Sequence, residues 1–177
     1  EIDKQTTPAA KADTIAHRTK KTITERMDED PTFYRKFSKV LEDAIAAFRA
    51  KRISDTEYLK KVQEAYEKVL SKGESDLPAN LPGTPSAGPI YNTILGALNA
   101  TQLDEGDLVD AVKEIDSRLI ALAIVNFKSN SDIEKAMLNA VDDVLYDLND
   151  RHELDLSVEQ MDKICAECLS IMKSHHG

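Results

Sequence analysis

Two cysteines near the end of the sequence, Cys165 and Cys168, have the C-x-x-C spacing that redox enzymes and zinc sites use. A redox pair needs the start of a helix, where the dipole favours thiolate, and a structural zinc site needs four ligands. The last helix is predicted to begin at Ser157, so the pair falls mid-helix on its apolar face, and only His175 and His176 are near enough to add ligands. We therefore expect buried structural thiols and no metal site, with a small metal or thiol module as the weaker alternative.

Nucleophile and base pairs are not evident elsewhere in the sequence. No Ser, Cys or Asp stands in an obvious pairing with a histidine, which a catalytic triad would require. The sequence also has no glycine-rich phosphate loop of the G-x-x-x-x-G-K-[ST] type. We therefore expect no catalytic residue and no cofactor in this chain.

A basic cluster in the first predicted helix is the best candidate for contact with a charged ligand. Its members are Lys11, Arg18, Lys20, Lys21 and Arg26. A helix would align Arg18, Lys21 and, less closely, Lys11 against a row of phosphates. The alternative is an ordinary solvated face. Because nothing here resembles a base-reading helix, any DNA contact would be to the backbone.

A second cluster is acidic and lies in the sixth predicted helix. It consists of Asp142, Asp143, Asp147 and Asp150. The simplest interpretation is a solvated helix face, and the functional alternative is a patch that docks another protein. We keep these four carboxylates as protein-docking candidates.

Charge is distributed unevenly along the 177 residues, whose net charge is −9. Residues 1–72 hold 16 Lys and Arg against 13 Asp and Glu, and residues 73–177 hold 7 against 19. The acidic second half should prefer protein partners to nucleic acid. With no secretory leader and no apolar run of about 20 residues, we expect a cytoplasmic segment of a larger protein, without a membrane partner.

The elements that must position these clusters are helices. Apolar spacing of three and four residues and repeated capping boxes predict an all-α bundle of about seven amphipathic helices. The first helix spans residues 9–27, and the others start near Pro31, Asp55, Ile90, Asp104, Ser131 and Ser157. The capping boxes begin at Ser54, Ser131 and Ser157. The helix after Pro31 has the strongest apolar stripe. Residues 119–125 are apolar nearly all round and are expected to be buried.

Prolines and glycines divide the chain into three predicted parts. Residues 73–89 contain four of the six prolines and cannot form a regular element, which predicts a long connector. Residues 1–72 then form a basic three-helix part, and residues 90–177 form an acidic four-helix part. One continuous helical domain is the alternative to this division.

Several stretches resemble the C-terminal helical region of the restriction (motor) subunit of bacterial type I restriction-modification enzymes. The stretches are ADTIA (12–16), TKKTITERM (19–27), DPTFY (30–34), FSKVLEDAI (37–45), RIS (52–54), EYL (57–59), DVLYD (143–147) and LSVEQMD (156–162). They bracket most of the chain, and the middle, residues 73–130, resembles the family weakly.

This resemblance implies a role in assembly and not in catalysis. The whole family subunit is an ATP-dependent site-specific deoxyribonuclease, with a nuclease and a DNA translocase that use ATP and Mg²⁺. The resemblance implies that this segment follows the motor and docks it onto the modification and specificity subunits of the methyltransferase complex, with DNA-backbone contact as a further role. The main alternative is a freestanding helical nucleic-acid-binding module.

Overall fold

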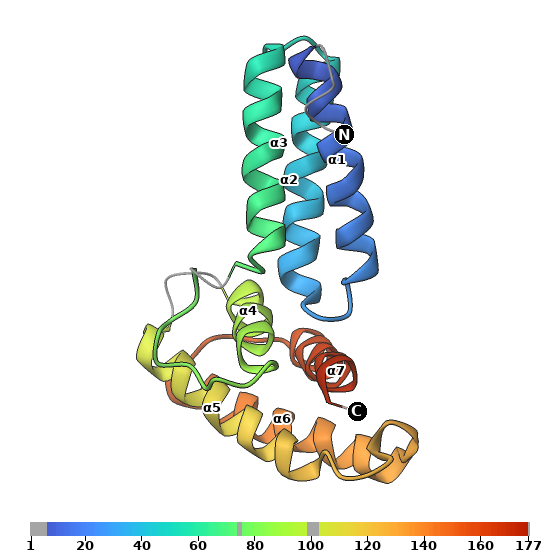
Figure 1. Ribbon diagram of the computed structural model, residues 1–177. Coiled ribbons are helices and arrows are strands. Elements are labelled where there is room, and N and C mark those ends of the chain that lie inside the picture. Colours follow the sequence, from blue (N-terminus) through green and yellow to red (C-terminus); the bar gives the residue numbers. More distant parts are fainter. Residues whose placement is uncertain (1–6, 74–75, 99–102, 177) are drawn as a thin grey trace. The chain divides into compact units, whose positions relative to one another are not determined.

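The protein is all-helical in the parts that the computed structural model describes, residues 7–73, 76–98 and 103–176. Seven α-helices and no strand are present in these ranges, which confirms the predicted fold class (Figure 1). The helices are α1 (Pro8–Glu25), α2 (Pro31–Arg49), α3 (Asp55–Leu70), α4 (Ala87–Ala97), α5 (Glu105–Leu122), α6 (Ser131–His152) and α7 (Val158–His175). A short 3-10 helix, η3 (Phe127–Ser129), precedes α6.

The chain divides into two compact units. Unit 1 consists of residues 1–27 and 33–76, and unit 2 consists of residues 28–32 and 77–177. The boundary between the longer pieces therefore falls inside the predicted connector. Helix α4 begins at Ala87, three residues before the predicted start at Ile90.

Helices α1, α2 and α3 make up unit 1 and begin as the sequence predicts. Pro31 is the first residue of α2, where its missing N–H costs nothing. Ser54 caps α3 in a capping box: its hydroxyl accepts from the Glu57 N–H, and Glu57 accepts from the Ser54 N–H at 2.8 Å. Two local signals thus fix the positions of α2 and α3 in the chain.

Packing within unit 1 is uneven. Helices α1 and α3 approach each other closely along their length, because Ala12, Ala16 and Ala65 are small. Helix α2 adds Leu41 and Ala44 to the shared core, but its backbone stays farther from both neighbours. Unit 1 is therefore a close helix pair with a third helix held off by larger side chains.

The end of α3 depends on one glycine. Gly73 has a φ of +64°, and a Cβ added there would lie 2.6 Å from the Phe33 ring. Its N–H donates to the Lys68 carbonyl, which closes the last turn. A side chain at this position would disturb the small core of Ile23, Phe33, Tyr34 and Val69.

Helices α4 to α7 make up most of unit 2 and form a closed set of neighbours. Helix α5 packs on α4 and α6, and α7 packs on the same two helices (Figure 1). Their inner faces share one core that runs from Ala87 to Met172. The turn segment after residue 76 joins this core through Leu77 and Leu81.

Two expectations for unit 2 are wrong. Helix α6 is capped by Asn130 instead of Ser131, because the Asn130 side chain reaches the Asp132 and Ile133 N–H groups. The predicted burial of residues 119–125 is wrong, because Ile120 faces solvent within α5 and the helix ends at Leu122. Leu119 is buried, but Ile124 is 59% and Val125 88% exposed.

No helix in the described ranges is long and apolar enough to span a membrane.

Candidate functional site

An open groove runs along unit 1 between α2 and α3. Its volume is about 1160 Å³. Apolar side chains form the floor, and the floor residues are Phe37, Val40, Ala44, Ala47, Ile53 and Ala65. Along α2 the lining extends from Lys36 to Ala47, about 17 Å or three helical turns.

The groove exists because α2 has more apolar surface than unit 1 covers. Leu41 is buried, but Val40 is 42% exposed, and Phe37 is only half-buried. Helices α1 and α3 pack against each other and cover one side of the α2 stripe. The other side of the stripe becomes the floor of the groove.

Charges of both signs line the rim of the groove. The cations are Lys36, Arg52, Lys61 and Lys68, and the anions are Asp43, Glu64, Glu67 and Asp76. At one end, Lys68 donates to both Asp76 oxygens, at 2.6 and 2.8 Å. At the other end, no described carboxylate lies within 4.0 Å of Arg52 or Lys61. The end with Lys68 is therefore neutralised by a close ion pair, whereas the charge of Lys61 is only partly offset by Glu57 on the same helix.

The strong apolar stripe predicted for the helix after Pro31 is the sequence signal that underlies this groove. The stripe on α2 is the strongest in the chain and is wider than one helix of a three-helix bundle needs. The width of an apolar stripe does not show whether the chain's own helices or a partner protein covers it. The structure separates the two cases, because it shows which stripe residues stay exposed.

The predicted basic cluster is split by the geometry of α1. At about 100° per residue, Arg18 lies within about 20° of Lys11 and 60° of Lys21, whereas Lys20 lies about 160° around the helix from Arg18. Arg26 follows the last residue of the helix. Lys21 is also paired with Glu25 at 3.7 Å, on an exposed face. Three cations, and not five, are aligned.

The predicted acidic cluster is split in the same way. Asp143, Asp147 and Asp150 lie within about 60° of one another on the exposed face of α6. Asp143 approaches Arg118 of α5, at 3.8 Å. Asp142 lies about 100° around the helix from Asp143, and its charge helps to raise the pKa of Cys165 in α7. Tyr146, which is 65% exposed, lies within about 100° of each of the other three carboxylates around the helix.

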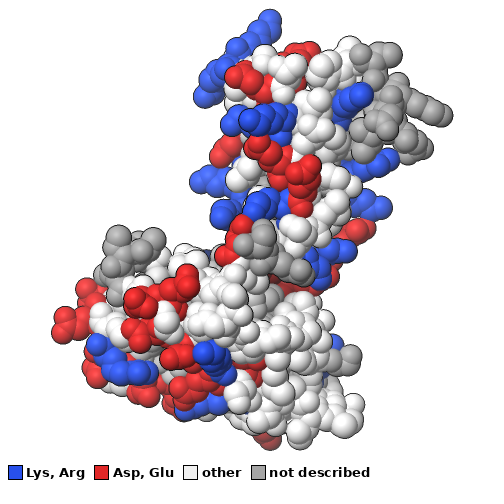
Figure 2. Space-filling model, turned by 60° about the vertical axis from the view of Figure 1, so that its left-hand side comes forward, with Lys and Arg blue, Asp and Glu red and all other residues white. Residues whose placement is uncertain are grey.

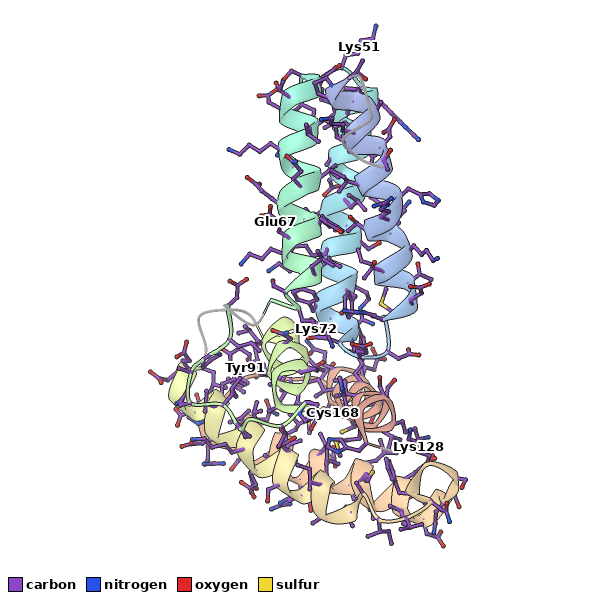
Figure 3. All side chains as sticks on the ribbon, viewed as in Figure 1. Lys51, Glu67, Lys72, Tyr91, Lys128 and Cys168 are labelled. Atoms are coloured by element: carbon purple, nitrogen blue, oxygen red, sulfur yellow. The ribbon has the colours of Figure 1, made fainter. Side chains whose placement is uncertain are left out.

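Both cysteines are buried in unit 2, as predicted, and Figure 3 labels Cys168. Burial raises the pKa of Cys165 to about 12, and the carboxylates of Asp142 and Asp162 act in the same direction. Burial also raises the pKa of Cys168. The thiols are held in their protonated form, which is poorly suited to redox chemistry or metal binding. Within the described ranges, no three His, Cys, Asp or Glu residues gather as a metal site would need.

A buried polar network in unit 2 was not predicted. The Ser86 hydroxyl donates to Asp116 Oδ1 at 2.6 Å and lies 3.1 Å from His176 Nε2. Thr84 donates to the other Asp116 oxygen at 2.8 Å. The partners are 30 to 90 residues apart, so sequence spacing could not reveal them.

The order of this network does not match a catalytic triad. A triad places histidine between serine and carboxylate, whereas here serine lies between the other two groups. Ser86 is also fully buried, so no substrate could reach its hydroxyl. The network instead fixes the residues before α4 and the end of α7 to α5.

Comparison with known proteins adds no relative: no family model, curated protein or solved structure matches this chain.

Proposed function

We propose that this chain is a non-catalytic assembly domain, equivalent to the C-terminal helical region of a type I restriction subunit. Its role would be to dock the nuclease and ATP-dependent DNA translocase onto the modification and specificity subunits of the methyltransferase complex. The sequence resemblance suggests the partner, and the open groove between α2 and α3 is the observation that carries the docking role.

The groove supports docking because exposed apolar surface of this kind is costly to leave in water. Burial of apolar area contributes roughly 25 cal/mol per Å², and Val40 and Phe37 present theirs side by side on α2. Apolar recesses with polar rims are typical of protein interfaces. The rim of the groove carries charges of both signs, which favours one orientation of a bound protein over others.

Unit 2 supports the same proposal from its charge. It holds 20 Asp and Glu against 7 Lys and Arg, which repels nucleic acid and so favours a protein over DNA as the partner of the chain. Figure 2 shows Asp and Glu gathered over part of the unit 2 surface in that view, and Lys and Arg interspersed with acids over unit 1.

Binding of the full 177-residue chain to a purified type I methyltransferase complex tests the proposal. Biolayer interferometry at 150 mM salt should give saturable binding at micromolar concentration or below. A methyltransferase complex that lacks its modification subunit is measured in the same way, to show whether that subunit carries the contact. Absence of binding at 50 µM of chain would rule out this function.

Contact with the DNA backbone is the second candidate function, and the alignment of Lys11, Arg18 and Lys21 on α1 favours it. Three phosphate contacts predict that log K falls with log salt at a slope of roughly −3. Fluorescence anisotropy with a labelled duplex measures this slope. Replacing Arg18 with Ala should make it shallower by about one unit, and an unchanged slope would count against the contact.

A further inference from the structure

We infer that the groove between α2 and α3 binds one amphipathic α-helix of a partner protein, whose apolar stripe lies on the alanine floor and whose carboxylates meet Arg52 and Lys61. This inference rests on the proposed docking function and specifies its site and the chemistry of its partner.

The backbone of the occupant is the first reason to choose a helix. Both walls of the groove are helices whose N–H and C=O groups bond within the helix, so the floor offers no backbone partners. An extended segment placed there would bury N–H and C=O groups without hydrogen bonds. A helix satisfies its own backbone and can lie on an apolar floor without this cost.

The shape of the floor is the second reason. Ala44 and Ala65 are small and already buried, so the ridge of a partner helix can lie above them, against the more exposed Ala47 and Val40. The floor extends for about three helical turns, which matches the contact length of a short amphipathic helix. The bound helix would cover the side of α2 that α1 and α3 do not cover.

Charge then defines the polar side of the occupant. Four cations against four anions on the rim do not attract a polyanion, which argues against nucleic acid in the groove. Lys68 is already neutralised by Asp76, whereas Arg52 and Lys61 have no described carboxylate within 4.0 Å. A helix with two carboxylates at that end would complement the rim.

The test uses two labelled synthetic helical peptides with the same leucine stripe. One carries two glutamates at one end, and the other carries two lysines in their place. Anisotropy with the full chain should show at least tenfold tighter binding of the glutamate peptide. The double variant Arg52→Glu/Lys61→Glu should reverse this preference. Equal affinity of the two peptides, or a preference that the double variant leaves unchanged, would overturn the inference.

A matched pair of variants locates the binding. Val40→Glu places a charge on the floor and should weaken the glutamate peptide at least tenfold. Leu70→Glu is the control, because Leu70 is 53% exposed on α3 but does not line the groove, and its effect should stay within twofold. Ala47→Arg is a second floor variant, and circular dichroism checks that all of them keep their helices. Equal effects of Val40→Glu and Leu70→Glu contradict the inference.

The same variants separate this inference from the proposed function. If the methyltransferase complex binds the wild-type chain and Val40→Glu equally, docking occurs elsewhere and the groove inference fails alone. If the peptides behave as expected but the complex does not bind the chain, the groove accepts a helix and the proposed partner is wrong.

Discussion

Among the described residues, unit 2 buries 25 apolar residues in one continuous core, whereas unit 1 has two separate clusters of 7 and 4. The difference lies in helix arrangement: each of the four helices in unit 2 has two helical neighbours, while α2 in unit 1 packs closely against neither α1 nor α3. A closed ring can bury every apolar stripe that faces inward, and an open arrangement of three helices leaves one stripe partly exposed. This comparison suggests that unit 2 provides stability and unit 1 provides a surface for binding.

Truncation of one buried leucine in each unit measures this difference, with the largest expected effect. Leu145→Ala in unit 2 should lower the free energy of unfolding by about 3–5 kcal/mol, because the closed core cannot collapse around the cavity. Leu41→Ala in unit 1 should cost nearer 2 kcal/mol, because side chains beside an open groove can relax. Urea denaturation followed by circular dichroism gives both values. An equal or larger loss for Leu41→Ala would break the comparison.

Loss of the buried carboxylate in unit 2 should have the next largest effect. Asp116→Ala removes the acceptor of two hydroxyl groups, and hydrogen bonds to a charged group contribute about 1.5–3 kcal/mol. Asp150→Ala is the control, because Asp150 lies on the exposed face of α6. Its change should stay within about 0.5 kcal/mol. If both variants are equally stable in urea, the network does not support unit 2.

The protonated thiols of unit 2 should be unreactive while it is folded. With the pKa of Cys165 raised to about 12, roughly one thiol in ten thousand is ionised at pH 8. Alkylation by iodoacetamide should therefore be at least 100-fold slower in the native chain than in urea. Mass spectrometry measures the rate of modification. Rapid modification of Cys165 or Cys168 in the native chain would show that the core of unit 2 opens often enough to expose them.

The raised pKa values of the thiols also predict how the free energy of unfolding changes with pH. An acid whose pKa is higher when folded retains its proton in the native state, so the stabilisation is complete below the unfolded thiol pKa of about 8.5. It is then lost progressively as the pH rises from about 9 toward 12. The free energy of unfolding should fall between pH 8 and 10 under reducing conditions. A double Cys165→Ala/Cys168→Ala variant should show a shallower fall, and identical slopes would contradict the assignment.

The smallest effect is expected at the surface of unit 1. Lys21→Ala breaks an exposed ion pair with Glu25, and such pairs contribute about 0.3–0.5 kcal/mol. The midpoint temperature of thermal unfolding should therefore change little in this variant, and the change should be smaller still at high salt. A large destabilisation would show that the basic face of α1 supports the fold, which would weaken its interpretation as a binding face.

Local signals explain why so much of the fold could be predicted. Ser54 and Ser157 occupy the cap positions that the sequence indicates, and Pro31 begins α2, because capping and proline preferences act within one helical turn. The prediction at Ser131 failed within the same turn, because the adjacent Asn130 is an equally good cap.

Contacts between distant residues explain what could not be predicted. The exposure of Ile124 and Val125 depends on where α5 ends, and the pairing of Ser86 with Asp116 depends on how the helices of unit 2 pack. The groove has the same origin: the stripe on α2 is visible in the sequence, but its exposed half is defined only by the positions of α1 and α3. The candidate DNA-backbone and docking residues stay predictions.

Hydrogen exchange with mass spectrometry tests the central claim most directly, because it reports on both units at once. On addition of the methyltransferase complex, we predict slower exchange in α2 and α3 along the groove, and unchanged exchange in the core helices of unit 2. Slower exchange confined to unit 2, with α2 and α3 unaffected by a complex that does bind, would contradict it.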